Sequence, residues 1–463
     1  MCQDSALLRR CVCFFLCCLI LVSGNLYSTP IDHKRSNGEQ QFKLGVKLLI
    51  ENQLEQAESA LLASLKLNPT NGKYHWETGW LYWKKQNWEK VIYHWHLTQK
   101  YTPKQIHLDR YLKLAIQYHD WNQQETDQNH IIQQPSRWEK SEKNKLTLIA
   151  VGDLMMGSDY QNISQLPSLG GTKLFDATSK FLKGDIVFAN LEGPLTAREK
   201  SEKCRDRKKC FVFRTPPEYG INLANAGFTV LNLANNHGLD FGLDGLKDTT
   251  NALKENNLEY FGSPGRSAIV LKINEINVGL FGVAAHFCCP HINQIKTNQQ
   301  TIEKLRRKTD LVIVSFHGGG EGLDAAHVTN KNEIYLGESR GNVKKFAHAM
   351  IDAGADLVIG HGPHTLRGME IYKNRPIVYS VGNFLGYKAF NTSGHLKYSM
   401  ILKVNFSKPN KIENIKVIPL LLDSKVVPQF DSTGRSIMIL NELSQTDFGI
   451  NALLLDKDGE RKL

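Results

Sequence analysis

The stretches that decide the fold of this chain are residues 310–317, DLVIVSFH, and residues 355–364, ADLVIGHGPH. Each is a short run of apolar, mostly β-branched residues that ends in histidine. Such a run is typical of a strand buried on both faces of a parallel sheet. Residues 340–354, between the two runs, carry a helical pattern of apolar positions. Strands that alternate with helices predict an α/β domain.

The same alternation continues in both directions from these two stretches. Further strand-like runs occupy residues 146–153, 185–192, 228–237, 276–284 and 375–384. Helical stretches are expected between them at residues 174–183, 216–227 and 243–257. We therefore predict one large α/β domain over residues 145–463.

Polar clusters stand at the ends of the predicted strands. They are Gly152-Asp153, Asn190-Leu191-Glu192, Asn235-Asn236-His237, His317 with Glu321, and His361-Gly362-Pro363-His364. Open α/β sheets build their sites at the carboxyl ends of strands. Carboxylate, amide and imidazole donors from several loops are what a site for one or two divalent metal ions requires. Mn, Fe, Zn and Mg all suit such a set.

Each cluster also has a structural interpretation. His317 could be a strand-end histidine whose hydrogen bonds are satisfied, and Asn235 could cap the helix that follows it. Asp240 and Asp244 suit caps or turns as well as ligands. The glycine run at residues 318–320 is a weak phosphate-loop signal, because no Lys-Ser/Thr pair follows it.

The order of these motifs resembles a known family. GD, NLEGPLT, LANNHGLDFGLDGL, VSFHGGGE, DAGADLVIGHGPH and YSVGNF occur in one succession between about residues 146 and 425. This succession is similar to that of the CapA-type capsule or poly-γ-glutamate synthesis proteins, within the calcineurin-like metallophosphoesterase superfamily. The resemblance implies a four-layer α/β/β/α sandwich and a metal-dependent hydrolase of the phosphoesterase type.

The resemblance also assigns roles to residues. It implies catalytic roles for Asp153 and His237, the latter as a proton donor to the leaving group. The implied metal ligands are Asp153, Glu192, Asn236, His317, His361 and His364.

Three positions depart from the superfamily pattern. Met155 replaces a histidine, Glu192 replaces a bridging aspartate, and Gly362 stands at the penultimate ligand position, one residue after His361. We therefore expect one tightly held metal ion, with a second dependent on these departures.

Residues 198–209, REKSEKCRDRKK, form a basic loop with 7 basic and 3 acidic side chains. The loop follows the Glu192 motif, so it is expected near the site. Arginine pairs with carboxylate or phosphate through two hydrogen bonds. The candidate substrate-binding residues are Arg205, Arg207, Lys208, Lys209, Arg214, Glu321 and Arg367. The alternative is a solvated loop without a ligand.

The beginning of the chain has the pattern of an export signal. Residues 9–10 are both arginine, and an apolar run of 12 residues, CVCFFLCCLILV, follows them directly. A secretory signal has an apolar core of about 7–15 residues. We predict that residues 1–27 are a cleaved signal peptide or an uncleaved membrane anchor, and that the protein is extracytoplasmic, in a periplasm where one exists. Export permits disulfides, and Cys204 with Cys210 is a candidate pair; the alternative is two free thiols. The adjacent Cys288 and Cys289 do not indicate a particular structure or function.

Residues 38–118 resemble a tetratricopeptide repeat module. Gly45 and Gly79 are 34 residues apart, as are Pro69 and Pro103. A period of this length with glycine and a closing proline is typical of paired helices that stack on their neighbours. Another kind of helical hairpin is the alternative. We expect the module to bind a protein partner, and residues 119–144 to be a linker.

The net charge of the chain indicates which class of binding partner to expect. The chain of 463 residues carries a formal charge of +11, which favours an anionic partner. A nucleic acid is not expected, because the excess is spread along the chain and no zinc-finger or RNA-binding motif is present. The leading hypothesis is an exported protein of anionic polymer synthesis, retention or export with a phosphoesterase-type site. The alternatives are a phosphoesterase for an envelope phosphoester and a non-catalytic scaffold.

Overall fold

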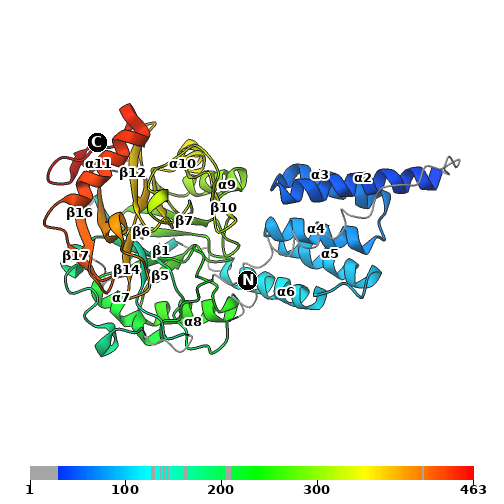
Figure 1. The fold of residues 1–463 in the computed structure, drawn as a ribbon, viewed down its shortest axis with the longest axis horizontal. Helices are drawn as coiled ribbons and strands as arrows, with labels where there is room; N and C mark the ends of the chain where they lie inside the picture. The colour runs from blue at the N-terminus through cyan, green and yellow to red at the C-terminus, as the bar shows by residue number, and fades with distance from the viewer. Residues whose placement is uncertain are drawn as a thin grey trace. The chain divides into compact units, whose positions relative to one another are not determined.

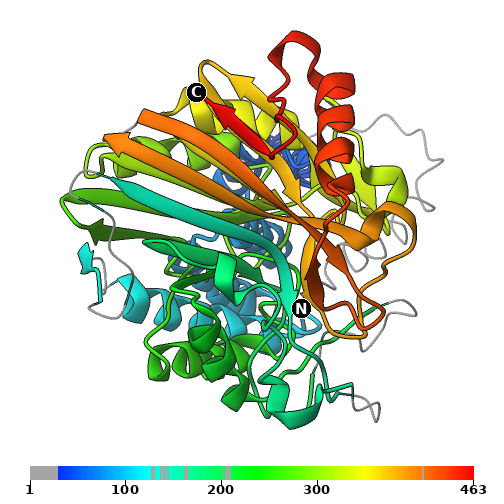
Figure 2. The same ribbon diagram turned by 90° about the vertical axis from the view of Figure 1, so that its left-hand side faces the viewer.

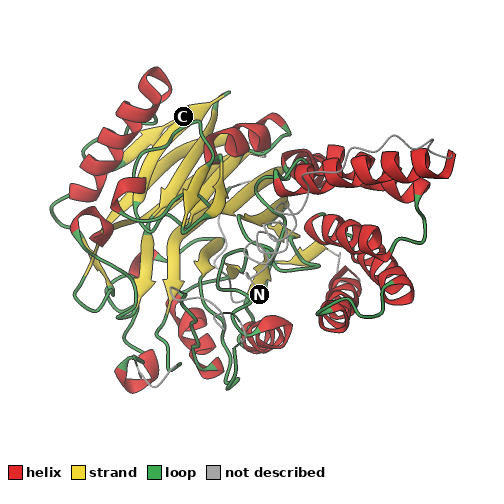
Figure 3. Cartoon of the chain, turned by 45° about the vertical axis from the view of Figure 1, so that its right-hand side comes forward, coloured by secondary structure: helices red, strands yellow, loops and turns green. Residues whose placement is uncertain are grey.

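A computed structural model describes residues 30–463 apart from 127–130, 136–137, 139–141, 143–144, 161–164, 202, 204–209 and 409–410. The chain divides into two compact units, residues 3–127 and residues 128–463. In the described parts, the first unit contains helices alone, and the second combines strands with helices (Figure 3).

The first unit is built from consecutive antiparallel helices. Gly45 packs against Leu61, and Gly79 packs against Trp95; a Cβ at Gly79 would lie 2.0 Å from the Trp95 Nε1 atom. Glycine thus lets two helices approach closely at equivalent places in two successive hairpins. The repeat type stays a prediction. The helices are α2 (Pro30–Ile50), α3 (Leu54–Leu67), α4 (Gly72–Lys84), α5 (Trp88–Tyr101) and α6 (Leu108–Thr126).

The segment 119–144 is more structured than the expected linker. Helix α6 continues to Thr126, and residues Ile131–Gln133 form strand β1, which pairs in parallel with β6 (Ala268–Ile273). Trp138 is buried in the core of the second unit. Strand β1 and the single buried side chain of Trp138 thus join this part of the segment to the α/β unit. Its sequence shows no helical or strand periodicity that would predict this.

The second unit is built on two sheets. The first sheet has the order β1, β6, β7 (Ile276–Ala284), β8 (Leu311–His317), β11 (Leu357–His361), β13 (Arg375–Val381) and β12 (Leu366–Tyr372). The second has the order β17 (Pro428–Phe430), β16 (Lys411–Leu422), β15 (Tyr398–Lys408), β2 (Leu146–Met155), β3 (Ile186–Leu191), β4 (Val230–Asn232) and β5 (Glu259–Phe261). In the second sheet, β14 (Asn383–Gly386) pairs with β2 and β18 (Glu460–Lys462) pairs with β16. The long strands β15 and β16 run beside β2 (Figure 2).

The two sheets pack face to face around one apolar core. Leu148 of β2, Leu280 of β7 and Ile359 of β11 belong to this core and are fully buried. A second apolar cluster joins the outer face of the first sheet to α9 (Ile295–Arg306) and α10 (Val343–Asp352). Helices α7 (Gly220–Ala226) and α8 (Gly242–Glu255) lie on the opposite side of the two sheets from α9 and α10 (Figure 1). Helix α11 (Arg435–Phe448) packs on β12. This arrangement is the calcineurin-like α/β/β/α sandwich.

One expected helix is absent. Residues 174–183 form turns and a short 3₁₀ helix, Ser179–Phe181, because Asp176, Thr178 and Ser179 favour turns over helix. In the described ranges, no helix is long and apolar enough to cross a membrane. The proposed signal at residues 1–27 lies outside those ranges. Cys210 is disulfide-bonded, whereas Cys204, its candidate partner, lies outside the described residues.

Candidate metal centre

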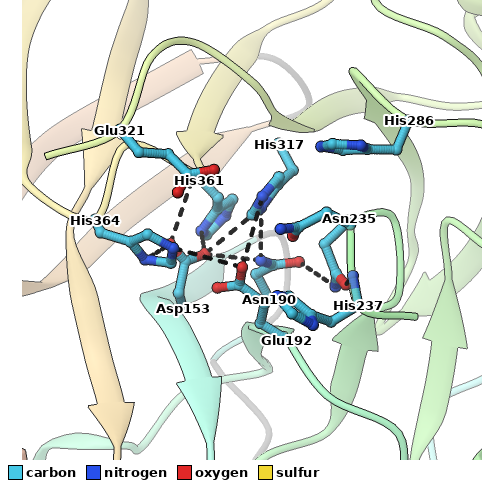
Figure 4. A network of polar contacts seen from close by, with 12 residues as sticks. Asp153, Asn190, Glu192, Asn235, His237, His286, His317, Glu321, His361 and His364 are labelled. Carbon is cyan, nitrogen blue, oxygen red and sulfur yellow. Dashed lines mark hydrogen bonds and ion pairs between the residues drawn. The ribbon is translucent and has the colours of Figure 1, made fainter. Parts of the chain in front are cut away.

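The site lies where the carboxyl ends of strands from both sheets meet. Asp153 stands near the end of β2, Glu192 directly follows β3, and His317 and His361 end β8 and β11. The register pairs Asp153 with Asn190 in one sheet and His361 with His317 in the other. The sandwich brings these two pairs together in the interior (Figure 4).

Asp153 is the centre of the cluster. Its Oδ1 atom lies 3.6 Å from the Nδ1 atom of His361 and 3.8 Å from the Nδ1 atom of His317. Its Oδ2 atom lies 3.3 Å from the Nδ1 atom of His364. Asp153, His317 and His361 are fully buried. Three imidazoles thus converge on one carboxylate.

Glu192 faces the same space from the next strand. Its Oε1 atom lies 3.6 Å from the His364 Nε2 atom and 3.7 Å from the His317 Nε2 atom. One ligand atom from each of Asp153, Glu192 and His364 lies within 4.8 Å of the other two. These three residues form a group that can hold a metal ion, and two histidines border it.

The donors of this cluster are left without ordinary partners. Within the described part of the chain, five buried atoms of this cluster have no hydrogen-bond partner. They are both carboxylate oxygens of Glu192, both ring nitrogens of His361 and the Nε2 atom of His317. Buried polar atoms are nearly always hydrogen-bonded, because an unsatisfied one costs about 1–3 kcal/mol. Carboxylate and imidazole groups are the donors that Mn, Fe and Zn prefer. The residues present therefore fit a divalent cation.

The pKa shifts of these buried groups also fit a metal-binding site. Burial raises the pKa of Glu192 well above its ordinary value. Burial would also raise the pKa of Asp153, but the hydrogen bond and charge of His364 outweigh it and hold that pKa well below its ordinary value. Burial lowers the pKa of His361 to about 4 and that of His317 well below its ordinary value, so both rings are neutral. Neutral imidazole is the form that binds metal.

Two asparagines hold Asp153 in position. The Asn190 Nδ2 atom donates to Asp153 Oδ1 at 2.7 Å, and its Oδ1 atom accepts from Asn235 Nδ2 at 3.0 Å. The Asn235 Oδ1 atom accepts from the backbone N–H groups of His237 and Gly238. Asn235 therefore holds a turn and does not cap the next helix, α8, which begins at Gly242; it also supports the site. No separate role was expected for Asn190 from the sequence, although its place at a strand end was a usable signal.

His237 is held by a carboxylate and an aromatic ring. Its Nδ1 atom lies 2.8 Å from Asp240 Oδ2, and its ring stacks on Phe213 at 4.2 Å. A carboxylate only accepts hydrogen bonds, so the shorter contact, with Asp240, favours a proton on Nδ1 and a lone pair on Nε2, while the Lys203 ammonium lies 3.1 Å from the same Nδ1 atom. Burial lowers the pKa of His237 to about 4. Figure 4 shows the ring beside Asn235 and Glu192.

Lys203 completes this arrangement from the basic loop. Its Nζ atom forms a buried ion pair with Asp240 and donates to the Asn236 backbone oxygen at 2.8 Å. The side-chain Oδ1 atom of Asn236 is buried without a hydrogen-bond partner in the described structure, as a metal ligand would be. The sequence analysis missed Lys203, because a lysine in a charge run gives no signal of burial.

The departures from the superfamily pattern have structural consequences. Gly362 has φ 107°, and a Cβ there would lie 3.0 Å from the Gly318 nitrogen. A side chain at position 362 would be strained and crowded, and the imidazole of the preceding residue, His361, lies 3.6 Å from Asp153. Met155 is buried, and its sulfur accepts a hydrogen bond from the Gly157 N–H at 3.0 Å.

The predicted substrate-binding residues fall in three different places. Glu321 lies beside the cluster and forms an ion pair of 2.9 Å with Arg340, which sequence reasoning missed. Arg367 is fully buried, and its guanidinium donates to Glu333 and to backbone oxygens, so it supports the loop around the site from inside.

Arg214 is likewise engaged within the protein, donating to Asp159 at 2.6 Å and to the Arg198 oxygen at 2.9 Å. Arg205, Arg207, Lys208 and Lys209 lie outside the described residues.

Comparison with known proteins gives a family match within the α/β unit. The family model described as "Bacterial capsule synthesis protein PGA_cap" matches residues 147–388. The chain is 30% identical to a capsule biosynthesis protein CapA of Bacillus anthracis, over 60% of this chain and 68% of that protein. It is 30% identical to the PGA biosynthesis protein CapA of Bacillus subtilis, over 64% and 77%.

A probable polyglutamine synthesis accessory protein of Mycobacterium tuberculosis is 28% identical, over 57% and 69%. Among solved structures, a purple acid phosphatase from yellow lupin matches with a TM-score of 0.33 and 11% identity, over 62% of this chain and 53% of that one.

Proposed function

Because this chain belongs to the bacterial capsule synthesis protein family, we propose that it acts in making or exporting an anionic surface polymer of the poly-γ-glutamate type. We further propose that its second unit carries a metal-dependent site of the phosphoesterase type. The names of the Bacillus relatives as capsule and PGA biosynthesis proteins support the first proposal, and the chemistry of the cluster supports the second.

The observation that carries the site proposal is the set of buried donors without partners. Glu192, His317 and His361 point polar atoms into one interior space that holds no donor or acceptor for them in the described structure. A divalent cation would give a partner to the Glu192 carboxylate, the His317 Nε2 atom and one ring nitrogen of His361. The proposed ligands are Asp153, Glu192, Asn236, His317, His361 and His364.

The chain's own residues would set up hydrolysis. A bound metal lowers the pKa of a coordinated water to about 7 and polarises a phosphoryl oxygen. Asn190 and Asn235 fix the direction of the Asp153 carboxylate. Asp240 holds the His237 proton on Nδ1, which leaves Nε2 to accept a proton in the site and then deliver it to a leaving oxygen.

The substrate would be an acidic polymer or a phosphoester. The basic loop at residues 198–209 supports this, since Lys203 joins the loop to Asp240 beside His237. Replacing Arg205, Arg207, Lys208 and Lys209 together with glutamine should weaken binding of polyglutamate and flatten its dependence on salt. The matched control replaces four exposed lysines of the helical unit, Lys66, Lys73, Lys90 and Lys100. Equal binding by both variants would contradict a role for the loop.

The location and the protein partner are further parts of the proposal. Residues 1–27 would direct export and associate the protein with the membrane, and α2–α6 would bind a protein of the same pathway. Recovery of the intact protein from the envelope fraction, and its release when residues 1–27 are replaced by a cleavable signal, would support anchoring. Retention in the cytoplasm would contradict export.

Metal analysis of purified full-length protein tests the site. Wild type should retain a divalent metal after dialysis, and Asp153→Ala and His317→Ala should lose most of it. Asp458→Ala and His395→Ala replace exposed residues of the same types and should retain it. If all variants keep the same metal, the ligand assignment is wrong.

A second measurement separates an enzyme from a scaffold. Metal-loaded wild type should hydrolyse a generic aryl phosphate, and His237→Ala should lose that activity while keeping its metal. Metal binding without turnover of aryl phosphate would favour a scaffold with a degenerate site, an alternative that Met155 favours by removing one imidazole. Loss of surface polymer in cells that carry His237→Ala would link the site to polymer synthesis.

A further inference from the structure

Two adjacent cysteines lie against the metal centre. Cys288 and Cys289 follow β7, and their sulfur atoms are 2.7 Å apart, well inside the contact distance of two non-bonded sulfurs. Both side chains are thiols in this structure. Closing a disulfide would shorten this distance to about 2.05 Å.

The surroundings of the pair are apolar. Cys288 and Cys289 pack in a small buried cluster with Ala234 and Ala284, and Leu239 borders it. Cys289 is fully buried, whereas Cys288 is 6% exposed. Because Cys288 is the more exposed of the two residues, we expect a small oxidant to react with it first.

The pair is connected to the site by one hydrogen bond. The Cys288 Sγ–H group donates to the backbone oxygen of Asn235 at 2.9 Å. The side chain of Asn235 in turn holds Asn190 and caps the turn at His237. A change at the Cys288 sulfur is thus transmitted directly to the residue that supports both Asp153 and His237.

We propose that Cys288 and Cys289 are a redox-active pair that closes to a vicinal disulfide and thereby loosens the turn at Asn235. The oxidant is a peroxide. Cys288 is oxidised to a sulfenic acid as hydrogen peroxide is reduced to water, and the Cys289 sulfur then attacks it. The S–S bond forms, a second water leaves, and the two thiols have together lost two protons and two electrons. A dithiol reverses the change by forming its own disulfide.

Oxidation removes the donor that Asn235 uses. A disulfide sulfur carries no hydrogen, so the Asn235 carbonyl would be left buried without this partner. A buried acceptor without a donor is unfavourable, so the turn at residues 235–238 should open more often. The two cysteines themselves lie outside the proposed ligand set, whereas the turn contains Asn236, one of the proposed ligands; formation of the disulfide does not depend on whether the site is an enzyme.

The first test is chemical. Full-length protein is reduced, freed of reductant, treated with hydrogen peroxide in the folded state, denatured and alkylated. The wild-type peptide that contains Cys288 and Cys289 should lose two hydrogens and take up no alkylating agent. In Cys288→Ser and Cys289→Ser the remaining cysteine should gain oxygen instead, more slowly in Cys288→Ser. Alkylation of both cysteines after peroxide treatment of wild type, or gain of oxygen without disulfide, would overturn the proposal.

The second test measures the connection to the site. Amide hydrogen exchange in a peptide covering residues 230–242 should be several-fold faster in the oxidised than in the reduced wild type. The double variant Cys288→Ala/Cys289→Ala controls for effects of peroxide elsewhere and should show no difference between treated and untreated protein. Equal exchange in oxidised and reduced wild type would contradict the connection to Asn235, and faster exchange in the treated double variant would assign the effect to another residue.

Discussion

The Nδ1 atom of His361 lies 3.6 Å from the Oδ1 atom of Asp153, although the two residues belong to different sheets. This contact depends on Gly362, whose N–H donates to the other oxygen of Asp153 at 3.3 Å. The chain turns at Gly362 with φ 107°, so His361 and His364 reach the same carboxylate from its two sides.

Gly362→Ala should destabilise the protein and remove the metal. The new Cβ would lie 3.0 Å from the Gly318 nitrogen, and a non-glycine residue at this φ costs about 1–3 kcal/mol before the clash is counted. Urea denaturation and metal analysis are the measurements. Gly337→Ala is the matched control, because Gly337 also has positive φ (78°) but no heavy atom stands near its Cβ position. Equal losses in both variants would mean that the crowding at His317 and Gly318 has no separate effect.

Glu192→Gln should change how the stability of metal-free protein depends on pH. The pKa of Glu192 is raised in the folded state, so the folded protein holds this proton more tightly than the unfolded chain. The contribution of Glu192 to the free energy of unfolding of chelated protein should therefore fall as pH rises above 4.5, the ordinary value. His364, whose pKa is also raised, acts in the same direction. The lowered pKa values of His237, His317 and His361 act in the opposite direction below the ordinary histidine value of 6.5, and the lowered pKa of Asp153 adds a constant contribution above its ordinary value. The comparison of wild type with Glu192→Gln therefore isolates the contribution of Glu192.

The measurement is urea denaturation in chelator between about pH 5 and 8, a window around the ordinary histidine pKa. The free energy of unfolding of wild type, measured relative to that of Glu192→Gln, should decline as pH rises through this window. Added metal should flatten the wild-type curve, because ionised Glu192 then has a partner. Parallel curves for the two proteins in chelator would contradict a raised pKa at Glu192.

Asp240→Asn should impair turnover without removing metal. An amide can donate to His237 Nδ1, which would move the imidazole proton to Nε2 and leave no lone pair facing the site. We expect kcat to fall about 10²–10⁴-fold, the range for a general acid–base residue. Metal content should match wild type, and Asp244→Asn, at an exposed position, should leave both quantities unchanged. Equal kcat in Asp240→Asn and wild type would show that the tautomer of His237 is unimportant.

Gly79→Ala should unfold the helical unit selectively. Its Cβ would lie 2.0 Å from the Trp95 Nε1 atom, and the Trp95 side chain is fully buried. We expect overpacking to lower the free energy of unfolding of this unit by about 1–3 kcal/mol. Limited proteolysis should then cut within residues 30–126 while residues 145–463 stay protected and keep their metal. Lys90→Ala, on the exposed surface of α5, controls for cleavage caused by substitution in this unit. Loss of metal in Gly79→Ala would mean that the two units are not independent.

Much of the fold follows from local pattern. The runs ending at His317 and His361 have the length and composition of buried parallel strands, and both are strands that end at those histidines. The prediction of a helix at residues 174–183 was wrong, because side chains that favour turns outweighed a weak helical pattern of apolar residues. The β1 strand was missed, since three residues are too few to show a period.

The sequence by itself determined which chemical groups the site contains and at which strand ends they stand, because motif order and strand pattern are properties of neighbouring residues. Only the tertiary structure decided which groups meet. Face-to-face packing of two sheets brings Asp153 and Glu192 to His317 and His361, and it buries Lys203 against Asp240. Such contacts depend on the twist and spacing of the packed sheets, and no short stretch of sequence records either.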